Sequence, residues 1–469
     1  ASCTLSHTLP TPLNTLFPPL STTFHHSTIF LRHLTRVNHT HRRRAMSSLS
    51  FPATTASNAA VLLPPTPEGF AEAGKRLRAG TLVAFPTETV YGLGANAFDE
   101  AAVRSIFTTK GRPLTDPLIV HVPTQKEALQ LLQLEPEAAI VYELLATTFW
   151  PGPLTLVGKA VDKIPLTVTA GTGFVGIRCP NHALAQSLLV AAQVPVAAPS
   201  ANRFGHVSPT TAQHVFNDLG THGIAIVNGE HVDATVPQQY DTCNVGIEST
   251  VAKVDSATKT IIIYRRGGIS EAAIKNCLAH TEYTVQALNK QVPHDPSQIP
   301  VDDVAAVADQ DTKVPDTKVE HVVANTGEQA PGQCLTHYAP DVATSLLCHF
   351  GTTGTAMAIN VHESCTTPLN ECIVIDFGGH LRELQKHVLE YRDLSTSSNV
   401  SEAAHRLFDT LRWTEHVEGA KQVLLVDICE VEQTSAPNVV QHQEHLSAVA
   451  DRMFRAASGH RVYVDSSSL

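Results

Sequence analysis

The stretch from residue 80 to residue 122 constrains the fold most strongly, because it reads as strand, polar turn, helix, basic turn and strand. An apolar run at 82–85 predicts a buried strand, and the turn PTETVYGLG after it ends in two glycines. Asp99 can cap the following helix, whose apolar residues recur at helical spacing, and Gly111 stands where that helix should end.

Polar residues lie at the joints of this unit. Lys110 and Arg112 flank the helix end, and in an extended chain both cations can face one anion. His121 interrupts the apolar strand 117–122 on the same side as Ile119. A surface hairpin does not need so many polar groups beside buried strands, so the unit predicts a site.

Length and composition exclude several classes of protein. The chain has 469 residues, enough for two or three domains, and its net charge of −11 disfavours a generally basic nucleic-acid-coating protein. The nine cysteines contain no CxxC pair, which indicates a reducing compartment and no zinc ribbon. No apolar run is long enough to span a bilayer, so we expect no membrane association.

The N-terminal segment has a composition of its own. No Asp or Glu precedes Glu68, and the segment is rich in Ser, Thr, His and Pro, with arginines at 42–44. Residues 1–66 are therefore expected to be an organellar transit peptide or a disordered tail. Met46 could start a shorter form, so the expected location is cytoplasmic, mitochondrial or plastid.

Three further regions follow. Residues 67–275 mix helices and strands, residues 276–340 read as a linker that ends in APGQCLTHYAP, and residues 341–469 alternate strand and helix. Helices are predicted at 67–79, 126–132, 136–149, 181–192, 211–219, 382–391, 402–413 and 446–457. Strands are predicted at 154–157, 174–178, 194–198, 224–227, 353–361, 372–377 and 422–428, with 249–254 pairing with 261–264. The last region is expected to be a small α/β domain with a mostly parallel sheet.

Four polar groups follow strands of the first domain: Thr87, Thr89 and Tyr91; Lys110, Arg112 and His121; Arg178; and Ser200, Asn202 and Ser208. Cations with hydroxyl and amide groups suit a phosphorylated or carboxylated ligand. No nucleophile with a matched base is evident, so transfer at a nucleotide phosphate by positioning and charge neutralisation is the leading hypothesis.

Each group also has a plainer interpretation. Lys110 and Arg112 could be a solvated helix end, and His121 could be a hydrogen-bonded core histidine. Ser200 and Asn202 could merely cap a turn. The coincidence of all four groups favours a site.

The motifs of the chain resemble those of the YrdC-type threonylcarbamoyl-AMP synthases in their long, two-domain form. They are PTETVYGLG (86–94), KGRP (110–113), PLIVHV (117–122), WPGPLT (150–155), GIRCP (176–180), APSAN (198–202), GIESTV (246–251), AHRLFDTLR (404–412) and ADRMFRAASG (450–459). The resemblance implies a YrdC-like catalytic domain with a twisted mixed sheet and a concave basic pocket. A long linker would join it to a small Rossmann-like α/β domain.

The resemblance also implies an activity: L-threonine, bicarbonate and ATP would give threonylcarbamoyl-AMP and pyrophosphate. A tRNA threonylcarbamoyltransferase would then pass the threonylcarbamoyl group to adenosine 37 of tRNA. The chain itself would bind tRNA only weakly. Mg²⁺ is expected with ATP, without dedicated protein ligands.

The resemblance assigns roles to individual residues. The catalytic signature is Lys110, Arg112, Ser200 and Asn202, and the ATP site adds Asp116, Ser208, Arg265 and, from a linker lid, Tyr338. The threonine site comprises Thr89, His121, Arg178 on the carboxylate, and Ser249, with Thr87 and Tyr91 in support.

The sequence departs from the family pattern at four places. Asp116 replaces the usual Asn and brings a negative charge near the expected triphosphate. YRRG (264–267) leaves the choice between Arg265 and Arg266 open. The segment 230–244 is longer than typical, and GQCLTHYAP lacks two cations of the usual lid. Two other functions remain as alternatives: a non-catalytic RNA-binding YrdC-like module, and a carbamoyltransferase-related enzyme.

Overall fold

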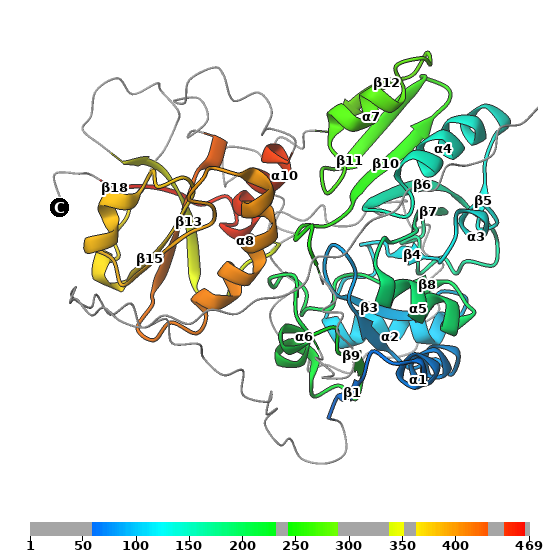
Figure 1. The fold of residues 1–469 in the computed structure, drawn as a ribbon, viewed down its shortest axis with the longest axis horizontal. Helices are drawn as coiled ribbons and strands as arrows, with labels where there is room; N and C mark the ends of the chain where they lie inside the picture. The colour runs from blue at the N-terminus through cyan, green and yellow to red at the C-terminus, as the bar shows by residue number, and fades with distance from the viewer. Residues whose placement is uncertain (1–58, 231–242, 289–336, 351–362, 430–444, 465–469) are drawn as a thin grey trace, which may run out of the picture. The chain divides into compact units, whose positions relative to one another are not determined.

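The computed structural model describes residues 59–230, 243–288, 337–350, 363–429 and 445–464, which form two α/β domains (Figure 1). The predicted strand at 353–361, most of the N-terminal segment, most of the linker and most of the long loop after Glu230 lie outside these residues. Within the described part of the chain, none of the helices combines the length and apolar character that a membrane span requires.

The first domain is built on a mixed sheet of twelve strands. The strands are β1 (Val61–Leu63), β2 (Val83–Phe85), β3 (Gly92–Asn96), β4 (Ile119–His121), β5 (Leu132–Gln133), β6 (Leu154–Ala160), β7 (Phe174–Arg178), β8 (Val196–Ala197), β9 (Ala225–Val227), β10 (Thr250–Asp255), β11 (Thr260–Arg265) and β12 (Thr284–Ala287). Their order is β1-β9-β2-β3-β8-β4-β7-β6-β10-β11-β12, and β5 pairs with β6. The predicted pairing of β10 with β11 is confirmed and is antiparallel.

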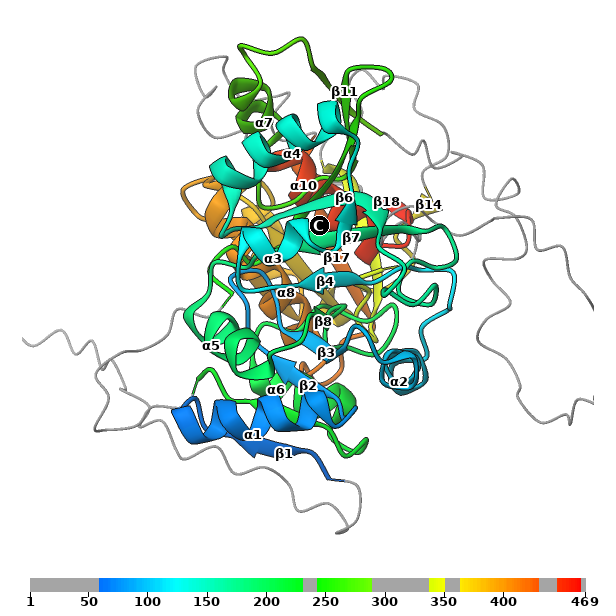
Figure 2. The same cartoon turned by 90° about the vertical axis from the view of Figure 1, so that its right-hand side faces the viewer.

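Seven helices accompany this sheet in the described residues: α1 (Pro67–Arg78), α2 (Glu100–Lys110), α3 (Gln125–Leu129), α4 (Pro136–Phe149), α5 (Ala183–Ala192), α6 (Ala212–Leu219) and α7 (Glu271–Cys277). In Figure 2, α1 lies beside the β1 end of the sheet, and α4 and α7 lie beside the other end. The predicted caps of α2 are confirmed. The Asp99 carboxylate accepts hydrogen bonds from the amides of Ala101 and Ala102, and Gly111 ends the helix at φ 66°.

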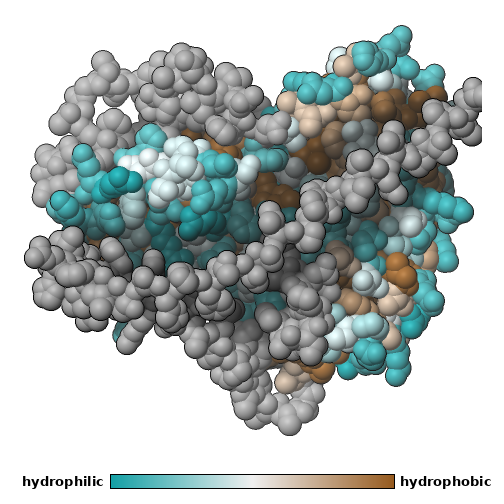
Figure 3. Space-filling model, viewed as in Figure 1, coloured by the Kyte–Doolittle hydropathy of each residue, from teal (hydrophilic) through white to brown (hydrophobic). Residues whose placement is uncertain are grey.

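The two ends of the sheet are covered to different degrees. Strands β2 and β4 are buried throughout, whereas β12 alternates exposed and half-buried residues. In Figure 3, hydrophobic side chains gather at the upper right, where Figure 1 places α4 and the β10–β12 end of the sheet. Ile140 on α4 is 71% exposed, so this end is less completely covered than the centre.

The second domain confirms the predicted parallel sheet. Its six strands are β13 (Ala343–Phe350), β14 (Glu363–Ser364), β15 (Cys372–Asp376), β16 (Glu390–Asp393), β17 (Gln422–Val426) and β18 (Arg461–Val464), in the order β14-β18-β13-β17-β15-β16. Every pairing among them is parallel. The long helices are α8 (Val400–Thr414) and α10 (Leu446–Ala456), and short 3-10 helices span Leu369–Glu371 and Arg382–Lys386.

The structure corrects the prediction at several elements. The glycine-rich part of PTETVYGLG is not all turn, because Gly92–Asn96 forms β3 between β2 and β8. A Cβ at Gly94 would lie 2.7 Å from Val196 Cγ1, so glycine permits this close packing. The predicted helix 382–391 is wrong: it gives way to a 3-10 turn and to β16, which pairs with β15.

Three predicted boundaries also differ from the structure. Strand β1 lies inside the expected tail and pairs with β9, and β12 lies inside the expected linker and pairs with β11. The helix expected at 126–132 ends at Leu129 and is followed by β5. In each case pairing with a distant strand decides the structure, which local sequence does not reveal.

The two domains share packed side chains. The hydrophobic cluster of the second domain includes Val90, Val207 and Ile247 from the first. Gly246 has φ 73°, and a Cβ there would lie 2.3 Å from the Cα of His405 in α8. Arg412 in α8 pairs with Asp218 in α6 at 2.9 Å, and both side chains are 3% exposed. The second domain is therefore packed directly against the loops that follow the strands of the first.

Candidate active site

One cavity gathers residues from loops and strand ends across the first domain. It is lined by Thr87, Thr89, Val90, Gly92, Arg112, Pro117, Ile119, His121, Arg178, Ala198, Pro199, Ser200, Glu248, Ser249, Arg265 and His337. The space between these residues, including open solvent at its mouth, is about 580 Å³. Eight of the residues predicted for the site line this one cavity: Thr87, Thr89, Arg112, His121, Arg178, Ser200, Ser249 and Arg265.

Arg178 stands at the end of β7 and is held in a fixed orientation. Its Nη1 donates a 2.9 Å hydrogen bond to Thr89 Oγ1, and its Nη2 lies 2.8 Å from Glu88 Oε1. Thr87 Oγ1 lies 2.8 Å from Thr89 Oγ1 and donates to the main-chain oxygen of Val90 at 2.7 Å. Glu88 and Thr89 of the PTET turn thus fix the orientation of the Arg178 guanidinium at the cavity.

His121 lies on β4 beside Arg178 and is 4% exposed. Burial and the neighbouring guanidinium lower its pKa from 6.5 to about 3. Its Nδ1 has no hydrogen-bond partner among the described residues. The imidazole is therefore neutral near pH 7, and that nitrogen is available to a ligand.

Arg112 and Asp116 form a buried pair at the basic turn. The Nη2 of Arg112 lies 2.9 Å from Asp116 Oδ2 and also donates to the main-chain oxygen of Pro117 at 2.9 Å. The Nε of Arg112 donates to the Asp116 main-chain oxygen at 3.2 Å. Arg112 lines the cavity and Asp116 does not, so the carboxylate acts behind the guanidinium.

Lys110 does not line the cavity. Its Nζ donates a 2.7 Å hydrogen bond to the main-chain oxygen of Ser200 and another to that of Asn202. Burial lowers the pKa of this ammonium well below its usual value, and the charge of Arg112 adds to the effect. Lys110 thus holds in place the turn that carries Ser200.

Asn202 and Ser208 also lie outside the lining. The Nδ2 of Asn202 donates to the main-chain oxygens of Arg203 and His206, each at 2.7 Å. This contact agrees with the plainer interpretation of Asn202 as a residue that caps a turn. Ser208 Oγ donates to Glu248 Oε1 at 2.7 Å, so its link to the cavity passes through a glutamate.

Ser249 and Arg265 line the cavity together and contact each other. Arg265 donates to the main-chain oxygen of Ser249 from Nε and Nη2, and Nη2 lies 3.2 Å from Ser249 Oγ. Thr155 Oγ1 lies 2.8 Å from the same hydroxyl. The neighbouring Arg266 faces Glu271 at 3.6 Å and does not line the cavity, whereas Arg265 does.

The two aromatic residues predicted for the site lie behind its wall. Tyr91 is buried and donates to Glu230 Oε1 at 2.8 Å. Burial, with Glu230 beside it, raises the pKa of this phenol well above its usual value. The ring of Tyr338 stacks on Phe408 at 5.2 Å, and burial raises its pKa to about 12. Its hydroxyl has no partner among the described residues.

Three lining or adjacent residues escaped the sequence analysis. Glu88 and Glu248 are buried carboxylates within PTETVYG and GIESTV, and His337 precedes Tyr338 in the linker motif. Burial and nearby cations lower the pKa of His337 well below its usual value. The signal for the glutamates was their position beside buried strands, where a carboxylate needs a partner that the local sequence does not contain.

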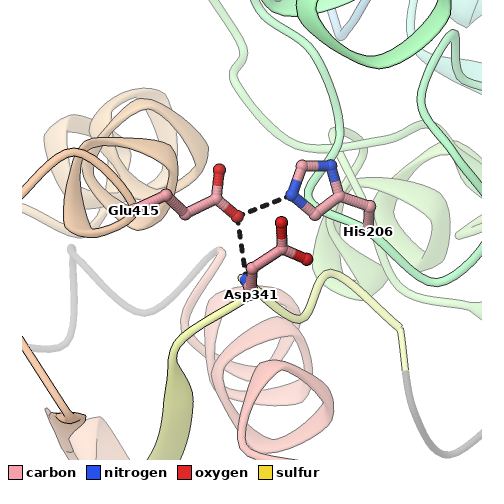
Figure 4. A group of neighbouring side chains, drawn as sticks. All are labelled: His206, Asp341 and Glu415. Carbon is pink, nitrogen blue, oxygen red and sulfur yellow. Dashed lines mark hydrogen bonds and ion pairs between the residues drawn. The ribbon is translucent and has the colours of Figure 1, made fainter.

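One group in the described residues has the geometry to hold a metal ion: His206, Asp341 and Glu415, whose ligand atoms lie within 4.8 Å of one another. Figure 4 shows Glu415 accepting hydrogen bonds from the His206 ring and from the Asp341 amide. The other ring nitrogen of His206 lies 2.8 Å from Asp218 Oδ2. These contacts already satisfy both ring nitrogens, and none of the three residues lines the cavity.

Comparison with known proteins gives matches over both domains. A family model described as "Telomere recombination" (Sua5/YciO/YrdC) matches residues 75–267. A second, described as "Threonylcarbamoyl-AMP synthase, C-terminal domain", matches residues 270–458.

Individual relatives agree with these models. Threonylcarbamoyl-AMP synthase of Pyrococcus abyssi is 40% identical over 216 residues, which are 46% of this chain and 59% of the relative. A putative threonylcarbamoyl-AMP synthase of Mycobacterium tuberculosis is 33% identical over 210 residues, 45% of this chain and 89% of the relative. The crystal structure of P. abyssi Sua5 complexed with L-threonine has a TM-score of 0.59 at 26% identity, and covers 86% of this chain and 99% of that chain.

The sequence matches to the Pyrococcus and Bacillus subtilis relatives span 59% and 55% of those proteins, so they leave part of each relative unmatched. The Mycobacterium relative is matched over most of its length, and the two family models together extend from residue 75 to residue 458. The chain belongs to the Sua5/YciO/YrdC family.

Proposed function

We propose that the chain is an L-threonylcarbamoyladenylate synthase, a nucleotidyltransferase that uses ATP, L-threonine and bicarbonate. The observation that carries this proposal is the single cavity that holds Arg112, Arg178 and Arg265 together with the hydroxyls of Thr89 and Ser249. Three guanidiniums in one partly enclosed space suit two anionic substrates that must approach each other. The names of the matched relatives support the same activity.

The proposed reaction has two steps, formation of a carbamate and its transfer to the α-phosphate of ATP. The threonine amine, having lost one proton, attacks the carbon of bicarbonate, an N–C bond forms, and water leaves with the carbamate as product. A carbamate oxygen then attacks the α-phosphorus of ATP, and the bond between that phosphorus and the α,β-bridging oxygen breaks to release pyrophosphate. Neither step needs a protein nucleophile, so the chain contributes orientation, exclusion of water and charge neutralisation.

For threonine, we propose that Arg178 receives the carboxylate. Its orientation by Thr89 and Glu88 leaves the planar guanidinium facing the cavity, and such a fork matches a carboxylate. Thr89, His121 and Ser249 would contact the remaining polar groups, and neutral His121 can accept a hydrogen bond at Nδ1. The P. abyssi structure with L-threonine bound supports a threonine site in this fold.

For ATP, we propose that Arg112, Arg265 and Ser200 face the phosphates or the nucleoside, since all three line the cavity. Lys110 and Asn202 would act by holding the turn that carries Ser200. Asp116 would partly offset the positive potential of Arg112 from the side away from the cavity. Ser208 would orient the carboxylate of Glu248 by its hydrogen bond.

We also propose that Mg²⁺ enters with ATP. The carboxylates at the cavity, Glu88, Glu248 and Asp116, each already pair with an arginine. The residues therefore fit an ion held by phosphate oxygens and water. When bound, the ion would neutralise phosphate charge.

The test is release of pyrophosphate by the purified protein, which should require threonine, bicarbonate and ATP together. Equal release without threonine, or no release at all, would contradict the proposal. A product that supports N6-threonylcarbamoylation of tRNA by a partner transferase would place the enzyme upstream of that step. RNA binding without pyrophosphate release would favour the non-catalytic alternative.

We propose in addition that the part of residues 1–66 that precedes β1 directs part of the protein to an organelle, on the ground of its composition. Fluorescent fusions that begin at residue 1 and at Met46 should then differ in location. Identical location of the two fusions would contradict dual targeting.

A further inference from the structure

An arginine of the second domain pairs with a carboxylate that lines the cavity of the first. Arg452 lies on α10, and its side chain is fully buried. Its Nε lies 3.1 Å from Glu248 Oε2, and its Nη1 donates a 2.6 Å hydrogen bond to the main-chain oxygen of Arg266. The guanidinium carbon lies 5.7 Å from the centre of the Tyr338 ring.

Glu248 is the residue on which these contacts converge. It lines the cavity and is 6% exposed, and each carboxylate oxygen has one partner: Ser208 Oγ on Oε1 and Arg452 Nε on Oε2. The carboxylate is therefore fixed by one residue of its own domain and by one that follows it by 204 positions in the chain.

The charge of Glu248 would otherwise oppose the function of the cavity. A buried carboxylate without a counter-charge repels other anions strongly at short distance, because the surroundings screen it poorly. The cavity has arginines for anionic ligands, and Arg112 and Arg178 already pair with Asp116 and Glu88. Arg265 of the first domain also interacts electrostatically with Glu248, but among the described residues it is Arg452 that forms an ion pair with this carboxylate, at 3.1 Å.

We propose that Arg452 is a positioning residue of the synthase. It neutralises and orients Glu248 from behind, so that the second domain sets the affinity of the cavity for anionic substrates. This inference rests on the proposed activity. It gives the second domain a role beyond packing.

A double-mutant cycle tests this role, with Arg452→Met, Glu248→Gln and the double variant compared by pyrophosphate release. Arg452→Met leaves Glu248 charged and unpaired, so we expect the KM for ATP to rise by about tenfold or more, with a smaller change in kcat. In the Glu248→Gln background the same substitution should change that KM by less than about twofold, because residue 248 no longer carries a charge. Asp451, which also lies near Arg452, keeps Arg455 as a partner.

A purely structural role predicts a different result. If Arg452 only holds the domains together, Arg452→Met changes the KM by the same factor in both backgrounds, and that outcome would overturn the proposal. Arg452→Lys serves where Arg452→Met fails to fold, because it keeps the charge but lacks the fork. We expect it to retain an ATP KM nearer to wild type than Arg452→Met, and an equal loss in both would count against charge neutralisation.

A matched control shows whether loss of any paired arginine of the second domain changes ATP binding. Arg461→Met removes an arginine that pairs with Asp427 at 2.9 Å within the second domain. It should leave the KM for ATP unchanged. Failure of the proposed function is distinguishable throughout, because the wild-type protein would then release no threonine-dependent pyrophosphate. If the wild type is active but Arg452→Met changes the KM equally in both backgrounds, the role of Arg452 is rejected and the proposed activity stands.

Discussion

Lys110 Nζ donates hydrogen bonds to the main-chain oxygens of Ser200 and Asn202, some ninety residues further along the chain. A lysine that terminates α2 thereby fixes the turn after β8. The basic KGRP motif is thus divided between two tasks: Lys110 supports the cavity wall, and Arg112 forms part of its lining.

Replacing Lys110 with Met should reduce both stability and activity. The buried main-chain oxygen of Asn202 would lose its donor, which costs about 1–3 kcal/mol, and the half-buried oxygen of Ser200 would lose one at a smaller cost. We expect a lower midpoint of urea unfolding together with weaker ATP binding, because the Ser200 turn loosens. Lys75→Met, on a side chain that is 77% exposed, is the control. A Lys110→Met protein of wild-type stability that lacks turnover would instead indicate direct contact with substrate.

Replacing Asp116 with Asn should strengthen ATP binding. The amide keeps the shape of the carboxylate and removes the charge that is 2.9 Å from the Arg112 guanidinium. Arg112 retains its two main-chain acceptors, so its orientation should persist. We expect the KM for ATP to fall by about two- to tenfold, with kcat little changed. A raised KM would show that Asp116 is needed to orient Arg112.

Replacing Arg178 with Lys should weaken threonine binding by about 10–100-fold, because an ammonium cannot replace a planar fork that also holds Thr89 and Glu88. Calorimetric titration with threonine measures this effect directly. Arg104→Lys, at a side chain that is 56% exposed, should bind threonine as the wild type does. Unchanged affinity in Arg178→Lys would place the threonine carboxylate elsewhere.

Replacing Tyr338 with Phe tests its buried hydroxyl. The ring contact with Phe408 remains, and a hydroxyl without a partner among the described residues is removed, so stability should be unchanged or slightly higher. If that hydroxyl serves the nucleotide, ATP affinity should fall by about tenfold. Tyr338→Ala should in addition destabilise the protein by about 3–5 kcal/mol through the cavity it leaves. Full ATP affinity in Tyr338→Phe would restrict the residue to packing.

The His206 network predicts a pH dependence of stability. Burial lowers the pKa of His206, but its hydrogen bonds to Asp218 and Glu415 outweigh burial and raise the pKa above 6.5, while Arg412 opposes them weakly. The folded state therefore holds the proton more tightly than the unfolded state. This contribution to the free energy of unfolding is full below pH 6.5 and is lost as the pH rises through the folded pKa.

Urea unfolding between pH 5.5 and 9 measures this contribution. We expect the stability of the wild type to decline with rising pH more steeply than that of His206→Gln, which cannot take up the proton. Parallel curves for the two proteins would contradict a protonated His206 between the domains.

Sequence reasoning was most successful where local patterns decide structure. The cap at Asp99, the glycine end of α2 and the antiparallel pair β10–β11 follow from neighbouring residues. Six polar residues of the cavity lining were also found in this way, because polar side chains at strand ends are uncommon in apolar surroundings: Thr87, Thr89, Arg112, His121, Arg178 and Ser200. Ser249 and Arg265 came from the family resemblance instead.

The remaining features depend on residues far apart in the chain. The sequence around Lys110 does not predict that its ammonium binds carbonyls at the Ser200 turn. The sequence around Glu248 does not predict that Arg452 is its partner. Strand β16 follows from pairing with β15 and not from its own composition. Which cation contacts substrate and which supports the wall is therefore a property of tertiary structure alone.

The pairing of Glu248 with Arg452 also has a consequence for biosynthesis. The two residues are 204 positions apart, and a ribosome that adds about 5–20 residues per second needs roughly 10–40 s to connect them. Once β12 has been made, the strands of the first domain are complete while the carboxylate of Glu248 still lacks Arg452 as its partner. If Arg452 has the proposed role, a chain that stops before residue 452 would bind ATP more weakly than a chain that includes it.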